Sequence, residues 1–186
     1  MELSISRVGA VLFDRDGTLV EDVPYNGDPA LVRLMPGARS ALRRLREAGL
    51  PVGVVSNQSG VARGLITREQ VDAVNARIDT LLGPMDAWEY CPHGEIDGCA
   101  CRKPEPGLIL AACAALGVAP DETVVVGDIG SDMGAAQRAG AVGILVPTRE
   151  TRIEEIAYAP HVAEDLADAV EVVLDAHASR AAGSIR

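Results

Sequence analysis

Two aspartates spaced two apart, Asp14 and Asp16, directly follow a short apolar run at residues 8–13. A run of this length indicates a buried strand, and an open α/β sheet binds ligands beyond the carboxyl ends of its strands. Gly17 permits a sharp turn after the pair. One carboxylate could then act as nucleophile and metal ligand, while the other donates a proton to a leaving group. Taken alone, the same residues would also suit an ordinary loop.

Three further strand-like runs, residues 51–55, 86–90 and 123–126, also lead into polar clusters. These clusters supply hydroxyl and amide groups, two cations and a second acid pair: Ser56, Asn57 and Gln58; Arg102 and Lys103; Asp128 and Asp132. We expect them to converge at one edge of a parallel sheet, where strand ends meet. That inventory suits phosphoryl transfer, in which positioning and charge neutralisation supply most of the catalysis.

In the order and content of its four clusters, the chain resembles the haloacid dehalogenase (HAD) superfamily of aspartyl-phosphate hydrolases. The resemblance runs from Asp14 to Asp132, about two thirds of the chain. It implies that Asp14 attacks phosphorus to form an aspartyl-phosphate. It also implies that Asp16 protonates the departing sugar oxygen and then deprotonates the water that breaks this intermediate.

Within the superfamily, residues 56–64 and the Cys/His loop before Arg102 and Lys103 resemble the D-glycero-D-manno-heptose 1,7-bisphosphate phosphatases. The related histidinol-phosphate phosphatases share the metal loop. They usually carry Asp where this chain has Ser59, and they lack its continuation at residues 62–64. One position departs from the heptose pattern, because Ile129 stands where a Lys often follows the first Asp of the last motif.

The resemblance implies a Mg²⁺ ion held by the Asp14 carboxylate, the Asp16 backbone carbonyl and Asp128. A cation is needed because two unit charges about 4 Å apart repel by about 4 kcal/mol at an effective dielectric near 20. Lys103 would add a second positive charge on the transferring group. Hydrogen bonds to the phosphate oxygens would come from two further residues, Ser56 and Asn57.

Four other residues have two open interpretations each. Asp132 would support the metal site or cap a helix N-terminus. Arg102 and Arg63 would bind a non-transferring phosphate or sugar hydroxyls, or else be solvated surface charges. Gln58 would bind sugar or shape its loop.

Four potential zinc ligands, Cys91, His93, Cys99 and Cys101, lie within one loop at residues 91–101. Three thiolates and one imidazole can surround a tetrahedral Zn²⁺, and four protein ligands make such an ion structural. A disulfide is the alternative, but it fits a reducing compartment poorly and leaves His93 unexplained. The remaining cysteine, Cys113, lies in an Ala-rich segment and is expected to pack in the core.

The chain has 186 residues, which suits one globular domain, expected at residues 1–178, with a flexible tail at 179–186. Its formal net charge of −10 argues against broad nucleic-acid binding, which needs a basic surface, but not against a small phosphorylated sugar. The N-terminal segment has no apolar stretch long enough for a signal peptide or a membrane span. We therefore expect a cytoplasmic protein, without membrane partners and monomeric.

Helical patterns alternate with the strand-like runs, which predicts a doubly wound parallel sheet of the HAD-like Rossmannoid class. The predicted helices span residues 37–48, 67–82, 106–116, 131–139 and 165–177, with a fifth strand at 142–146. Val162 is a candidate short strand, and the C-terminal segment is expected to close the sheet's edge. Only residues 19–36 separate the first motif from the next helix, so we expect an open, essentially capless site.

The function that the resemblance implies is Mg²⁺-dependent removal of the C7 phosphate from a heptose 1,7-bisphosphate, a step in nucleotide-activated heptose biosynthesis. The alternatives are a histidinol-phosphate phosphatase or a broader small sugar-phosphate phosphatase. A catalytically silent zinc-loop interaction module would require a lost catalytic position, yet all are present. A polynucleotide 3′-phosphatase would need a basic groove, which the acidic composition disfavours.

Overall fold

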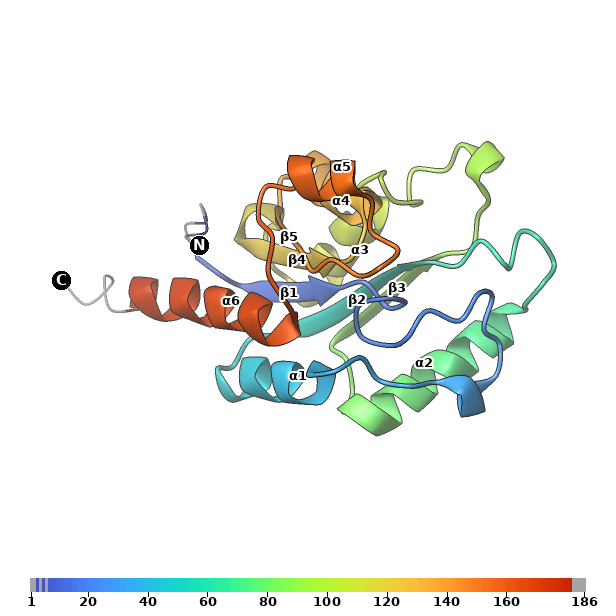
Figure 1. Cartoon of the computed structure of the whole chain (residues 1–186), viewed down its shortest axis with the longest axis horizontal. Coiled ribbons are helices and arrows are strands. Elements are labelled where there is room, and N and C mark those ends of the chain that lie inside the picture. The colour runs from blue at the N-terminus through green and yellow to red at the C-terminus, as the bar shows by residue number, and fades with distance from the viewer. Residues whose placement is uncertain (1–2, 4, 6, 182–186) are drawn as a thin grey trace.

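A five-stranded, fully parallel sheet in the order β3-β2-β1-β4-β5 forms the centre of the computed structural model, which describes residues 3, 5 and 7–181 (Figure 1). The strands are β1 (Ala10–Phe13), β2 (Val52–Asn57), β3 (Ala87–Cys91), β4 (Thr123–Gly127) and β5 (Val142–Leu145). The predicted fold class is therefore confirmed. The valine-rich central strands are buried on both faces, as expected for a parallel sheet covered by helices.

The strand register brings the predicted clusters to one edge of the sheet. Phe13 at the end of β1 lies opposite Val54 in β2 and Val126 in β4. The next residue, Asp14, donates its backbone N–H to the carbonyl of Val126 at 2.9 Å. The side chains that follow β1, β2 and β4 therefore start from neighbouring positions.

Helices cover both faces of the sheet (Figure 1). On one face, α1 (Ala38–Glu47), α2 (Arg68–Leu82) and α6 (Leu166–Ala181) share an aliphatic core. On the other face, α3 (Gly107–Leu116) and α4 (Gly130–Ala139) pack through alanines and small aliphatic side chains. Both cores are built with almost no aromatic residues, in keeping with an aromatic content of 3%.

A capping box opens α2, because Gln70 N donates to Thr67 Oγ1 at 3.2 Å and Thr67 N donates to Gln70 Oε1 at 2.8 Å. Several short elements were not predicted: α5 (Ile153–Tyr158) and the 3₁₀ turns Pro29–Leu31, Glu95–Asp97 and Pro120–Glu122. Elements of one or two turns carry too few residues for a periodic pattern.

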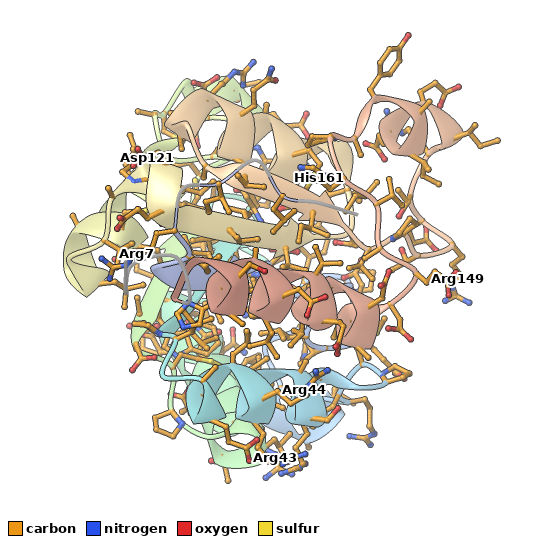
Figure 2. All side chains as sticks on the ribbon, turned by 90° about the vertical axis from the view of Figure 1, so that its left-hand side faces the viewer. Arg7, Arg43, Arg44, Asp121, Arg149 and His161 are labelled. Atoms are coloured by element: carbon orange, nitrogen blue, oxygen red, sulfur yellow. The ribbon has the colours of Figure 1, made fainter. Side chains whose placement is uncertain are left out.

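The C-terminal segment closes the sheet's edge only through Val162, which forms a parallel bridge with Leu145. Helix α6 packs instead on a face of the sheet beside α1, where Arg44 forms an ion pair with Glu171 (Figure 2). The helix continues to Ala181, four residues past its predicted end. Residues 182–186 of the predicted tail lie outside the described residues.

The segment between the first motif and α1 is short. Between residues 19 and 36, the described chain forms a single 3₁₀ turn and a bridge between Val20 and Leu34, without a cap domain. Within the described ranges, no helix is both long enough and apolar enough to cross a membrane.

Candidate active site

Asp14 and Lys103 form a buried ion pair at the carboxyl edge of the sheet. Lys103 Nζ donates to Asp14 Oδ1 at 2.6 Å, to Asp132 Oδ1 at 2.6 Å and to the carbonyl of Val55 at 2.8 Å. Lys103 is 4% exposed and Asp132 is fully buried. An ammonium has three protons, so these three acceptors satisfy it completely and fix its position.

The backbone of Lys103 is held by Asn57, the last residue of β2. Asn57 Nδ2 donates to the Lys103 carbonyl at 3.1 Å, and Lys103 N donates to Asn57 Oδ1 at 3.0 Å. The amide group is thus directed at Lys103. Phosphate binding by Asn57 stays a prediction, as does a phosphate contact from the buried Ser56 hydroxyl.

Asp128 follows β4 and faces the turn after Asp14. Gly17 has a φ of +83°, and a Cβ on it would collide with the Asp128 carboxylate, so only glycine fits there. Thr18 Oγ1 donates to Asp128 Oδ1 at 3.3 Å, and Thr151 Oγ1 donates to the Asp128 carbonyl at 2.6 Å. The Asp128 carboxylate is thereby oriented toward the first motif.

Three buried carboxylates share one ammonium in this cluster. Burial raises the pKa of Asp14 to about 8 despite the opposing effect of Lys103, and Asp132 and Asp128 raise it further. Burial, followed by Asp132, raises the pKa of Asp128 to about 7. Burial alone would lower the pKa of Lys103, but Asp132 and Asp14 outweigh it and raise that pKa. The cluster therefore has more carboxylates than cations, and near neutral pH part of the excess charge is taken up by bound protons.

The same cluster has the donor set that a hard divalent cation prefers. One carboxylate oxygen each from Asp14, Asp128 and Asp132 lie within 4.8 Å of one another. Oxygen ligands and a local negative excess suit Mg²⁺, so the residues fit the predicted ion. Asp132 also caps α4, since Ile129 N donates to its Oδ2 at 3.3 Å. Its two carboxylate oxygens thus serve different partners.

Asp16 lies beside this cluster in its own hydrogen-bond network. Arg15 Nε donates to both Asp16 oxygens, and Arg15 Nη2 is 2.9 Å from Oδ2. Gln58 Nε2 donates to Asp16 Oδ2 and to Ser56 Oγ, each at 2.8 Å. Gln58 therefore shapes the site through Asp16 and Ser56, and sugar binding by Gln58 stays a prediction.

A cavity of about 330 Å³ opens next to Asp16. Its wall includes the carboxylates of Asp22 and Glu150, and Ile129 forms another part of it. Burial, followed by Asp16 and Glu150, raises the pKa of Asp22. Carboxylates in such a wall can accept hydrogen bonds from sugar hydroxyls.

The two arginines predicted to bind substrate lie at the periphery of the site. Arg63 Nη1 donates to the Tyr25 hydroxyl at 2.8 Å, and Tyr25 lines the cavity. Arg102 points toward the Cys/His loop, with Nη2 3.5 Å from Glu95 Oε1 and Nη1 3.5 Å from the His93 carbonyl. The structure brings neither guanidinium to Asp14, so their substrate contacts stay predictions.

The four predicted zinc ligands are clustered at the end of β3. The Sγ–Sγ distances are 3.1 Å for Cys91–Cys101, 3.5 Å for Cys99–Cys101 and 3.6 Å for Cys91–Cys99, and His93 Nδ1 is 3.3 Å from Cys101 Sγ. Sulfurs about 2.3 Å from one tetrahedral zinc would be about 3.8 Å apart, close to these spacings. All the cysteines are free thiols, so the disulfide alternative is not what the structure has. The donor set fits Zn²⁺.

The Cys/His loop is joined to the loop that carries Gln58. Gln58 N donates to the Cys91 carbonyl at 2.7 Å, and Ala62 N donates to the Pro92 carbonyl at 3.0 Å. These two backbone hydrogen bonds hold the two loops side by side.

Sequence reasoning missed several residues of the site. Arg15 is 1% exposed, and its Nη1 donates to Asn75 Oδ1 on α2 at 3.0 Å. Thr18 and Thr151 orient Asp128, as described above. One local signal was available, since a charged residue, Arg15, stands between the two aspartates of the first motif, whereas nothing local marks Asn75 or Thr151 as parts of the site.

Comparisons with known proteins agree with this geometry. The HAD-hydrolase-like family model matches residues 100–169, which include Lys103, Asp128 and Asp132. A D-glycero-β-D-manno-heptose-1,7-bisphosphate 7-phosphatase of Pseudomonas putida is 36% identical over 147 residues, covering 74% of this chain and 82% of the relative. One of Bordetella bronchiseptica is 35% identical over 173 residues, covering 88% and 97%.

A solved structure is also similar. The crystal structure of D,D-heptose 1,7-bisphosphate phosphatase from B. bronchiseptica, complexed with magnesium and phosphate, superposes with a TM-score of 0.79 at 32% identity. The match covers 89% of this chain and 98% of that chain. The similarity thus extends over nearly the whole described fold.

Proposed function

We propose, since the chain belongs to the heptose-1,7-bisphosphate 7-phosphatase family of HAD-like hydrolases, that it removes the C7 phosphate of D-glycero-D-manno-heptose 1,7-bisphosphate. Membership of this family identifies the chain as a phosphatase, whereas its substrate is our proposal. This substrate would place the enzyme in nucleotide-activated heptose biosynthesis. One observation carries the chemistry: Lys103 Nζ bridges Asp14 and Asp132 at 2.6 Å each, with Asp128 beside them.

In this proposal, Asp14 is the nucleophile. Its carboxylate oxygen bonds to phosphorus while the bond from phosphorus to the sugar oxygen breaks. Asp16 gives its proton to that sugar oxygen, and the resulting carboxylate then accepts a proton from the water that hydrolyses the aspartyl-phosphate. Both groups follow directly after β1, so both could act on the same phosphate.

The transferring phosphate would be held by groups already fixed in place. Lys103 supplies positive charge, and Ser56 and Asn57 lie at the end of β2 where their polar groups could donate to phosphate oxygens. Asp14, Asp128 and the Asp16 carbonyl would hold Mg²⁺, supported by Asp132. When bound, the ion would supply charge that offsets the repulsion between carboxylate and phosphate dianion.

The rest of the substrate would occupy the acidic cavity beside Asp16. Gln58 and the carboxylates in its wall suit the hydroxyl groups of a sugar. Arg63 and Arg102 are the candidates for the second phosphate, and each would have to turn from its present partner. Zn²⁺ at the Cys/His loop would hold in place the segment that leads into Arg102.

We also infer a monomer in the cytoplasm. The three cysteines of the Cys/His loop would stay reduced in the cytoplasm and could therefore bind zinc, because disulfides do not form readily in that compartment. Size-exclusion chromatography with light scattering measures the oligomeric state, and cell fractionation the compartment.

The experiment that tests the substrate compares specificity constants for both anomers of the heptose bisphosphate and for histidinol phosphate. We expect one anomer to exceed histidinol phosphate by orders of magnitude, and the reverse order would overturn the assignment. Chelated enzyme should regain activity on Mg²⁺ addition. An Asp128→Asn variant should not regain activity on Mg²⁺ addition, because the substitution removes the negative charge of a carboxylate that we propose as a Mg²⁺ ligand.

A further inference from the structure

The two carboxylate oxygens of Asp16 differ in the number of hydrogen bonds that they accept from neighbouring side chains. Oδ2 receives Arg15 Nε at 3.0 Å, Arg15 Nη2 at 2.9 Å and Gln58 Nε2 at 2.8 Å. Among the residues that the structure describes, only Arg15 Nε donates to Oδ1, at 3.2 Å. Oδ2 therefore fixes the position of the Asp16 carboxylate, and Oδ1 can still form further hydrogen bonds.

The cation that holds Oδ2 is unusual in being buried. Arg15 is 1% exposed, and its guanidinium has two partners, Asp16 on one side and Asn75 Oδ1 on the other. Asn75 is itself buried on α2, a helix otherwise remote from the reacting groups. Burial of a guanidinium costs desolvation free energy. The planar guanidinium can donate two hydrogen bonds to one carboxylate and so fix the orientation of that carboxylate, which makes arginine suited to a positioning role.

We propose that Arg15, secured by Asn75, is a positioning residue that directs Asp16 Oδ1 at the leaving oxygen. This inference rests on the proposed role of Asp16 as proton donor. In the first step, Asp16 Oδ1 carries the proton. As the bond from phosphorus to the leaving oxygen breaks, its electron pair stays on that oxygen, which takes the proton from Oδ1. The negative charge left on Asp16 is stabilised by the Arg15 guanidinium.

The role predicts a dependence on the leaving group that a purely structural arginine would not have. A sugar alkoxide is a strong base and must be protonated as it leaves. A p-nitrophenolate is a weak base and leaves without a proton. Loss of correct positioning of Asp16 therefore lowers kcat/KM, which reports the transfer of phosphate to Asp14, for sugar phosphates and spares it for p-nitrophenyl phosphate. The later hydrolysis of the aspartyl-phosphate is common to both substrates and does not enter this comparison.

The test measures kcat/KM for p-nitrophenyl phosphate and for the best sugar phosphate of the wild-type enzyme, in Arg15→Gln, Arg15→Lys, Asn75→Ala and Asp16→Asn variants. We expect Arg15→Gln to lose about 100-fold on the sugar phosphate and under about 5-fold on the aryl ester. Asp16→Asn should show the same selectivity, and the double variant should show no further selectivity. Arg15→Lys, which keeps the charge, should recover part of the loss.

Arg43→Gln serves as the matched control, because this arginine also pairs with a carboxylate, Glu47, but on the outer surface of α1 (Figure 2). It should leave both rates unchanged. Equal losses on both substrates in Arg15→Gln would overturn the proposal. If Arg15→Gln does not fold, Asn75→Ala decides: a selective loss on the sugar phosphate supports the role, and an unselective loss or no loss overturns it.

The proposed substrate and this role fail in different ways. Inactivity toward heptose bisphosphate, with activity on another sugar phosphate, overturns the substrate assignment alone. The ratio of sugar-phosphate to aryl-phosphate loss decides the role of Arg15 whichever sugar phosphate is used.

Discussion

Lys103 and Asp132 are joined across the sheet edge by a 2.6 Å hydrogen bond between two fully or nearly fully buried charges. The second Asp132 oxygen caps α4 at Ile129, so the lysine is linked to a helix N-terminus. A Cβ on Gly127 would collide with Asp132, which shows how closely the backbone of β4 approaches this carboxylate. Lys103 is thus part of the core packing as well as of the candidate active site.

Replacement of the lysine should therefore cost both activity and stability. Lys103→Met leaves Asp14 and Asp132 buried without their cation, and removal of one partner of a buried pair costs about 3–5 kcal/mol. We expect kcat to fall by at least about 100-fold, as when a preorganised charge donor is lost. Urea unfolding and steady-state assays measure the two effects. Addition of Asp132→Asn to Lys103→Met should restore part of the stability and none of the activity, and a fully stable single variant would contradict the account.

Asn57 offers a test that separates positioning from substrate contact. Asn57→Ala removes both hydrogen bonds to the Lys103 backbone, which should lower the free energy of unfolding by about 1 kcal/mol per bond. We expect kcat to fall about 10-fold as the lysine loses its fixed position, with a smaller change in KM. Thermal unfolding and kinetics check this. A raised KM with unchanged stability would instead assign Asn57 to direct substrate binding.

The strands and larger helices could be predicted because each carries its own local signal. The apolar run before Asp14 marks β1, and Thr67 with Gln70 marks the start of α2. The polar clusters after β1, β2 and β4 could be assigned to one edge because parallel strands place their carboxyl ends together. Local patterns therefore identified the elements and predicted which polar clusters would meet at one edge of the sheet.

The supporting contacts could not be predicted, because they depend on residues distant in sequence. A sequence rule places arginine at the surface, yet Arg15 is buried because Asn75, 60 positions away, receives its guanidinium. Likewise, the side-chain amide of Asn57 suggests a phosphate donor when only the sequence is considered. In the structure, both its nitrogen and its oxygen form hydrogen bonds with the backbone of Lys103. Such pairings exist only once the sheet and helices have packed.

The acidic cluster should make the metal-free protein less stable as pH rises. The pKa of Asp14 is raised from its ordinary 3.8 to about 8, and that of Asp128 to about 7, chiefly by burial. Between about pH 4 and pH 8 the folded state therefore binds more protons than the unfolded state, and stability falls with increasing pH. Urea unfolding in chelator at pH 5 and pH 8 measures this difference. An Asp14→Asn variant should flatten the dependence, whereas an equally steep one in that variant would exclude Asp14 as its source.

The Cys/His loop should contain one zinc ion per chain, and its loss should reduce activity. Cys99→Ser removes one of three clustered thiols, whereas Cys113→Ser alters a buried thiol that contacts Thr123 and lies outside the cluster. We expect Cys99→Ser to lose zinc, measured by metal analysis, and to lose about 10-fold or more in kcat/KM, because Arg102 and Lys103 follow the loop directly. The Cys113→Ser control should retain the metal. Full activity in zinc-free Cys99→Ser would show that the loop does not position these cations, and zinc retained at one equivalent would remove Cys99 from the ligand set.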